Sequence, residues 1–145
     1  RDPMAMRPFC GYNMGDYWQH WLDMGKKLPN APKIFNVNWF RTDDNGRFLW
    51  PGFGDNLRVL EWILKRCFDE VGADETVIGY EPKPEDINLD GSGVTVETLK
   101  ALLTLDAESW RENCAGIREY FEQFGDKLPH ELREELEALE KAFAE

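Results

Sequence analysis

The sequence predicts an α+β fold in which helices predominate and an antiparallel β-hairpin provides the strands. Apolar residues recur every three or four positions in several separate stretches, which is the helical period. Apolar and polar residues alternate in KIFNVNWFR (33–41), which is the period of a strand. The chain has 145 residues, about the length of one domain.

The first elements follow from these two periods. Residues 1–12 contain two prolines and predict an extended segment, and residues 13–28 predict a helix. A second helix is expected over 55–71, with Asp55 as its N-cap. Its expected buried stripe consists of Leu57, Leu60, Ile63, Leu64, Cys67 and Phe68.

The hairpin is expected between these helices. The turn TDDNG (42–46) ends in Asn-Gly, a strong hairpin signal. RFLWP (47–51) returns as the second strand, with Phe48 and Trp50 on the same side. On the first strand the apolar set Phe35, Val37 and Trp39 is expected to face the core. Phe40 then lies on the polar face, with Asn36 and Asn38.

The rest of the chain is predicted to be largely helical. A short strand is expected in TVIGY (76–80), followed by a polar loop over 81–93. Helices are expected around 96–103, over 107–124 and from 129 to the end. Asp106 is expected to cap the second of these helices, and Pro129 suits the first turn of the last.

The composition argues against two classes of partner. With 17 Lys+Arg against 28 Asp+Glu, the net charge is -11. Non-specific nucleic-acid binding requires clustered basic residues, and anionic membranes attract basic segments, so we expect neither partner. No apolar run approaches the roughly 20 residues of a transmembrane helix. Three cysteines without CxxC spacing favour a reducing, cytosolic compartment.

The aromatic residues around the hairpin suggest a binding site for a flat ring. Five aromatics occur in the fifteen positions 39–53. Phe40 and Phe48 are expected to face each other across the hairpin, and Phe53 stands between two glycines that allow close approach of a ligand. Asn56 offers an amide that can read the edge of a purine. The alternative is a small hydrophobic core beneath the hairpin.

The residues of catalysis are largely missing. No phosphate-binding GxxxxGK[ST] loop and no GxGxxG motif occurs. His20 and His130 are far apart in the sequence, and Ser92 and Ser109 have no neighbouring histidine to activate them. We therefore predict that this chain contains no catalytic residue and no metal ligand of its own.

Three segments resemble the C-terminal part of GTP-dependent phosphoenolpyruvate carboxykinase. They are DPMAMRPFCGYNMGDYWQHWL, KIFNVNWFRTDDNGRFLWPGFGDNLRVLEW and IGYEPKPEDINLDG, and they follow in order over nearly the whole chain. FLWPGFG with VNWFR upstream is the most specific part. The resemblance implies that Phe40, Phe48 and Phe53 surround a guanine base. It also implies that the turn Phe53, Gly54, Asp55 and Asn56 contacts the base and favours GTP over ATP.

The resemblance also implies the activity of the intact enzyme. The family is a gluconeogenic carboxy-lyase that converts oxaloacetate and GTP to phosphoenolpyruvate, GDP and CO2. It uses Mn2+ at the active site and Mg2+ on the nucleotide. The ligands of both ions are expected in the upstream catalytic part, which would be this chain's partner. A cytoplasmic, monomeric enzyme is implied.

The expected organisation is the C-terminal portion of the carboxykinase nucleotide-binding domain over 1–145. It divides into a segment after the family's mobile lid (1–12), the guanine-clamp hairpin and loop (33–56) and a mostly helical remainder (57–145). The chain begins with Arg1 instead of Met, which we interpret as a fragment, predicted to be inactive alone. The alternative function is a free-standing, non-catalytic helical module that binds a nucleotide or a protein.

Overall fold

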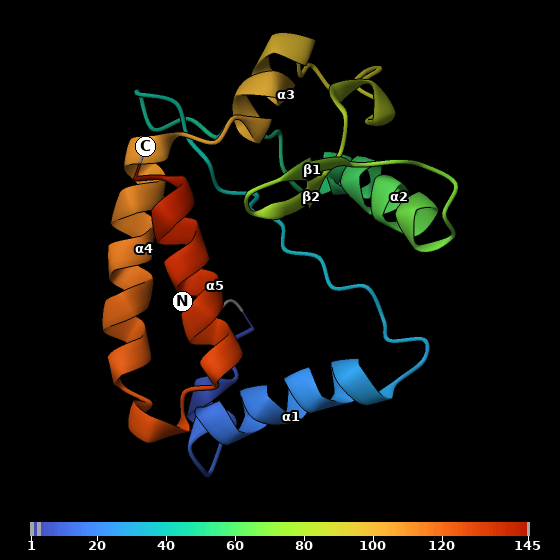
Figure 1. The fold of residues 1–145 in the computed structure, drawn as a ribbon. Coiled ribbons are helices and arrows are strands. Elements are labelled where there is room, and N and C mark those ends of the chain that lie inside the picture. Colours follow the sequence, from blue (N-terminus) through green and yellow to red (C-terminus); the bar gives the residue numbers. More distant parts are fainter. Residues whose placement is uncertain (1, 3, 145) are drawn as a thin grey trace. The chain divides into compact units, whose positions relative to one another are not determined.

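The architecture is α+β with helices predominating, which confirms the predicted class (Figure 1). It is taken from a computed structural model and is described for residues 2 and 4–144. The helices are α1 (Met14–Lys27), α2 (Asn56–Cys67), α3 (Val96–Leu103), α4 (Ala107–Glu122) and α5 (His130–Ala142). The strands β1 (Asp74–Thr76) and β2 (Gly79–Glu81) pair as an antiparallel hairpin. Short 3-10 turns lie at Arg7–Phe9, Phe53–Asp55, Pro84–Asp86 and Gly125–Lys127.

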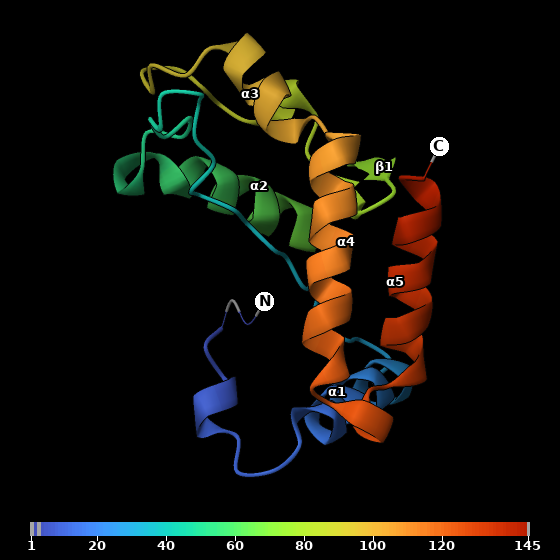
Figure 2. The same ribbon diagram turned by 90° about the vertical axis from the view of Figure 1, so that its left-hand side faces the viewer.

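The chain divides into two compact units. We call residues 1–32 with 105–145 the terminal unit, and residues 33–104 the central unit. The terminal unit contains α1, α4 and α5, and α4 and α5 lie side by side in both ribbon views (Figures 1 and 2). The central unit contains α2, α3 and the β1–β2 hairpin. The predicted segment 1–12 includes residues 1 and 3, which lie outside the described residues.

The terminal unit is held together around the start of α1. The Asn13 side chain accepts a hydrogen bond from the backbone N–H of Gly15 at 2.8 Å, and its amide donates to the Phe124 carbonyl at 3.2 Å. Gly15 lies so close to the Lys127 carbonyl that a Cβ would sit 2.2 Å from its oxygen. Only glycine therefore allows α1 to approach the turn after α4 this closely.

Aromatic rings fill the core of the terminal unit. The buried residues Met14, Phe124 and Leu128 pack with the partly buried Trp18 and Tyr120. The Trp18 and Phe124 ring centroids are 4.5 Å apart in an edge-to-face arrangement, which aromatic quadrupoles favour. These contacts connect α1 to the end of α4.

The helices of the last third were predicted correctly. The bounds of α3 match the expected 96–103, and α4 and α5 begin at 107 and 130. The Asp106 side chain accepts from the backbone N–H of Ser109 at 2.8 Å, as expected of an N-cap. Pro129 is buried and immediately precedes the first residue of α5.

The central unit packs around two tryptophans. Trp50, Trp62, Ile87 and Leu99 form its buried core, and Phe35 and Trp39 pack against them. The predicted inward set is therefore right for Phe35 and Trp39, whereas Val37 is exposed. Phe40 is exposed, as expected of the opposite face.

The predicted hairpin over 33–51 forms only at its turn. Residues 33–41 are not a strand, and Thr42 and Phe48 form one isolated antiparallel bridge. Backbone bonds of 2.9 Å run from Asp43 N to Arg47 O and from Leu49 N to Arg41 O. The regular antiparallel pair is β1–β2 instead. The Asn-Gly turn thus forms as predicted. Residues 33–40, however, pair with no strand among the described residues.

Two sequence-based orientations in the central unit were wrong. Phe48 is exposed and Trp50 is buried, because the chain bends at Leu49 and Trp50 and does not continue as a strand.

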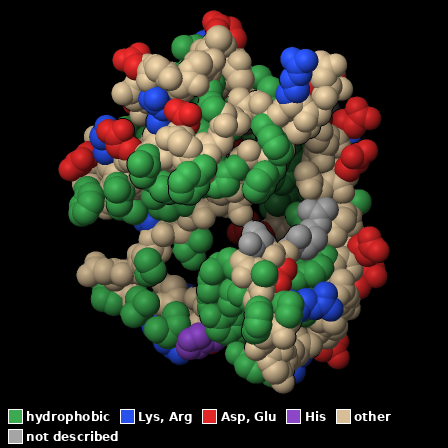
Figure 3. Space-filling view, turned by 180° about the vertical axis from the view of Figure 1, so that it is seen from behind, with side chains coloured by type: hydrophobic (Ala, Val, Ile, Leu, Met, Phe, Trp, Pro, Cys, Tyr) green, Lys and Arg blue, Asp and Glu red, His purple; other side chains and the backbone are tan. Residues whose placement is uncertain are grey.

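Helix α2 buries Trp62 and packs Val59 and Ile63 on the core. Leu57, Leu60, Leu64, Cys67 and Phe68 of the predicted stripe are exposed. Hydrophobic side chains are accordingly prominent on the surface view (Figure 3).

Candidate nucleotide-base site

Three of the predicted site residues present phenyl rings to solvent. Phe40 is 73% exposed, Phe48 64% and Phe53 93%. The alternative of a hydrophobic core beneath the hairpin would require these rings to be buried. Apolar rings that gather at the surface are a common feature of binding surfaces.

Phe40 and Phe48 lie together, as predicted. Their ring centroids are 6.2 Å apart with an angle of 64° between the planes. The bridge between Thr42 and Phe48 places the second ring, and the Asn38 side chain accepts a hydrogen bond from Phe40 N at 3.0 Å. In the described part of the chain, Phe53 makes no ring contact with either of them.

Phe53 is held outward by a turn that requires glycine. Gly52 has φ 112° and ψ -156°, a conformation that is essentially restricted to glycine. Asp55 N donates to the Gly52 carbonyl at 3.0 Å, and Asn56 N donates to the Phe53 carbonyl. Gly54 shows no left-handed backbone, and a Cβ there would meet nothing within 4 Å. Gly52 thus shapes the turn, while Gly54 leaves space beside the ring.

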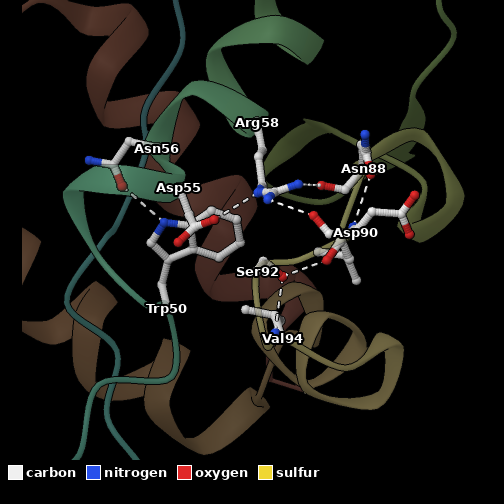
Figure 4. A network of polar contacts seen from close by, with 9 residues as sticks. Trp50, Asp55, Asn56, Arg58, Asn88, Asp90, Ser92 and Val94 are labelled. Atoms are coloured by element: carbon white, nitrogen blue, oxygen red, sulfur yellow. Dashed lines mark hydrogen bonds and ion pairs between the residues drawn. The ribbon is translucent and has the colours of Figure 1, made fainter.

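Asn56 occupies the first residue of α2 with its side chain already bonded. Its Oδ1 accepts a hydrogen bond from the Trp50 indole Nε1 at 2.9 Å (Figure 4). Trp50 is only 5% exposed, so this bond connects the core of the central unit to the candidate site. The amide nitrogen of Asn56 points away from the indole (Figure 4).

Asp55 precedes α2 as predicted, but its side chain makes no capping bond. It pairs instead with Arg58, with Oδ1 2.8 Å from Nε. The Arg58 guanidinium also donates to the carbonyls of Asn88 at 2.7 Å and Asp90 at 2.8 Å. Arg58 therefore ties the start of α2 to the loop after Pro84–Asp86 (Figure 4). The carboxylate of Asp55 thus pairs with Arg58, while its backbone N–H belongs to the turn that displays Phe53.

The acids of the central unit with a shifted pKa include two that lie outside the turn. Burial raises the pKa of Glu81, and the hydrogen bond from Lys33 lowers the pKa of Asp69, both outside the turn. Among residues 2 and 4–144, no group of three His, Cys, Asp or Glu could hold a metal ion. Within the same residues, no helix is both long and apolar enough to span a bilayer.

Two residues of the site were missed by sequence reasoning. Trp50 was assigned to a strand face, and Arg58 was not considered. The spacing of Asp55 and Arg58, three residues apart at a helix start, is a signal that could have identified the ion pair. No local signal identifies the bond between Trp50 and Asn56, because it depends on the bend that buries the indole.

Comparisons with known proteins agree on one family. The profile described as the phosphoenolpyruvate carboxykinase C-terminal P-loop domain matches residues 1–142. The chain is 50% identical over 143 residues to phosphoenolpyruvate carboxykinase [GTP] of Treponema pallidum (strain Nichols), covering 97% of this chain and 23% of that relative. It is also 50% identical, over 141 residues each, to the proteins of the same name from Corynebacterium efficiens and Thermoplasma volcanium, again covering 97% of this chain and 23% of each relative. The chain thus spans about 23% of the length of the relatives it matches.

Proposed function

The chain belongs to the GTP-dependent phosphoenolpyruvate carboxykinase family, and we propose that it forms the part of the enzyme that holds the guanine base of GTP and GDP. The residues proposed to bind the nucleotide are Phe40, Phe48, Phe53, Gly54, Asp55 and Asn56. The phenyl rings provide stacking surfaces, Gly54 provides space, and Asn56 provides the edge contact.

The observation that carries this proposal is the exposure of Phe53, at 93%, on a turn whose backbone only glycine allows. A turn that only glycine allows and that displays a large apolar ring is expected where a ligand covers that ring. Stacking of a base on an aromatic side chain contributes about 1–3 kcal/mol. Stacking does not distinguish purines, so the preference for guanine is assigned to hydrogen bonds at its edge.

For the intact enzyme we propose the reaction of the family, in which oxaloacetate and GTP give phosphoenolpyruvate, GDP and CO2. Positioning of the nucleotide is the main contribution that a protein makes to phosphoryl transfer. This chain would supply that positioning, while the upstream catalytic part supplies the reacting groups. The Mn2+ and Mg2+ of the family are assigned to that part.

We propose that the enzyme is cytoplasmic and monomeric, that residues 1–12 lead out of the lid, that 33–56 form the clamp and that 57–145 form the helical remainder. We further propose that the chain alone is catalytically inactive. The alternative, a free-standing module, would be favoured if the native reading frame upstream of Arg1 contained no phosphate-binding loop.

The test is a calorimetric titration of the 145-residue chain with GDP and with ADP, after circular dichroism establishes that it is folded. We expect GDP to bind more tightly than ADP. The same titration on the intact enzyme gives the reference affinities. If a folded intact enzyme bound both nucleotides equally, the assignment of a guanine site would be wrong.

A further inference from the structure

The Asn56 side chain is held in one orientation by a residue that is itself immobilised. Trp50 is 5% exposed and packs with Trp62, Ile87 and Leu99 in the core of the central unit. The Trp39 ring lies beside it, with centroids 6.2 Å apart. Because its neighbours enclose the indole, its N–H direction is fixed before any ligand binds.

The chemistry of the indole determines which end of the amide faces it. The indole Nε1–H can only donate, so its partner must be the acceptor Oδ1 of Asn56, and the distance is 2.9 Å. A reversed amide would place two donors against each other and leave the buried N–H unpaired. The Asn56 NH2 group is therefore directed away from the core, as Figure 4 shows.

We propose that Trp50 is a positioning residue that makes the base site selective for 6-oxopurine nucleotides over 6-aminopurine nucleotides. This inference rests on the proposed function. The outward NH2 of Asn56 can donate to the O6 acceptor of guanine, whereas adenine presents an amino donor at the same place. A site whose donor is left unpaired rejects the wrong ligand more strongly than stacking can.

Trp50 acts through Asn56 and does not itself touch the base. The same residue, Asn56, donates its backbone N–H to the Phe53 carbonyl and so also closes the turn that displays the ring. This backbone bond does not depend on the indole. Loss of the indole N–H should therefore reduce discrimination between nucleotides more than it reduces stacking.

The experiment compares two conservative substitutions in the intact enzyme. Trp50→Phe removes the indole N–H from the core. Trp62→Phe is the matched control, because Trp62 is buried in the same core but its Nε1 has no hydrogen-bond partner among the described residues. The dissociation constants of GDP and ADP are measured by calorimetry for both variants and for the unaltered enzyme.

We expect Trp50→Phe to lower the preference for GDP over ADP about fivefold, the effect of one typical hydrogen bond. Trp62→Phe should leave this ratio unchanged, whatever it does to stability. An unchanged ratio in folded Trp50→Phe, or an equal fall in both variants, would overturn the inference. If the unaltered enzyme does not prefer GDP, the proposed function fails and the inference fails with it. If the unaltered enzyme prefers GDP and Trp50→Phe keeps the same preference, only the inference about Trp50 fails and the proposed function stands.

A second measurement covers the case in which Trp50→Phe does not fold. With 15N-labelled tryptophan in the unaltered enzyme, the indole N–H signal of Trp50 is identified as the one shifted by Asn56→Asp. Hydrogen bonds in a chain polarise one another, so GDP should shift this signal and ADP should shift it less. Equal responses to the two nucleotides, or no response to bound GDP, would contradict the role assigned to Trp50.

Discussion

The core of the terminal unit and the candidate site of the central unit are both rich in aromatic rings, but they use them in opposite ways. In the terminal unit, Phe124 is 5% exposed and its ring centroid lies 5.2 Å from that of Tyr120 and 4.5 Å from that of Trp18. In the central unit, Phe40, Phe48 and Phe53 point into solvent. Aromatic density in a sequence therefore does not distinguish a core from a binding surface. The distinction is made by the backbone, which encloses one set and displays the other.

Removal of a buried ring should have the largest effect. Phe124→Ala deletes the ring at the centre of the terminal core, and we expect the free energy of unfolding to fall by about 3–5 kcal/mol. Urea denaturation of the chain, followed by circular dichroism, measures this change. A loss below about 1 kcal/mol would mean that the terminal core tolerates the cavity, and would remove the contrast between the units.

The turn that displays Phe53 offers a matched pair of substitutions. Gly52→Ala forces a side chain into the backbone region near φ 112°, and we expect a cost of about 1–3 kcal/mol in unfolding free energy. Gly54→Ala should be nearly neutral for stability, because a Cβ there meets nothing within 4 Å. Urea denaturation of the two variants gives the comparison. Equal losses in both would contradict the assignment of strain to Gly52 alone.

Removal of a displayed ring should affect binding and leave stability unchanged. For Phe53→Ala we expect the unfolding free energy to stay within about 0.5 kcal/mol. GDP binding should weaken by about 1–3 kcal/mol, because the stacking surface is lost. Denaturation measures the first quantity, and titration of the intact enzyme measures the second. A folded variant with unchanged GDP affinity would count against the proposed site.

An ion pair between helices should contribute the smallest effect. Arg118 donates to the Glu140 carboxylate across α4 and α5, and this hydrogen bond lowers the pKa of Glu140 below its ordinary 4.5. The stabilisation is therefore present above pH 4.5 and is lost as the pH falls through the lowered pKa of the folded state.

We expect Glu140→Gln to reduce stability slightly at neutral pH and to match the unaltered chain in acid. Denaturation at both pH values measures the difference. Glu135→Gln on the same helix is the control, because Glu135 forms no ion pair in the described part of the chain. A difference that persisted in acid would show that the pair is not its source.

The sequence by itself determined most helices and identified the aromatic residues that are exposed at the candidate site. The three- and four-residue spacing and the cap at Asp106 act over neighbouring positions, so they predicted α1, α3, α4 and α5. The same local reasoning singled out Phe53 between its glycines and the exposed face of Phe40. These features depend on contacts that are close in the sequence.

Only the tertiary structure decided which face of α2 is buried, that Trp50 is buried, and that the predicted hairpin forms only at its turn. Helix α2 has apolar residues on two sides, and the core takes Val59, Trp62 and Ile63, of which only Ile63 belongs to the predicted stripe. Residues 33–41 alternate as a strand does, but this alternation does not say whether another segment pairs with them. The bond from Trp50 to Asn56 exists because a bend turns the indole inward. Sequence periodicity encodes which residues share a face, but the choice of which face is buried is made by the elements that pack against it.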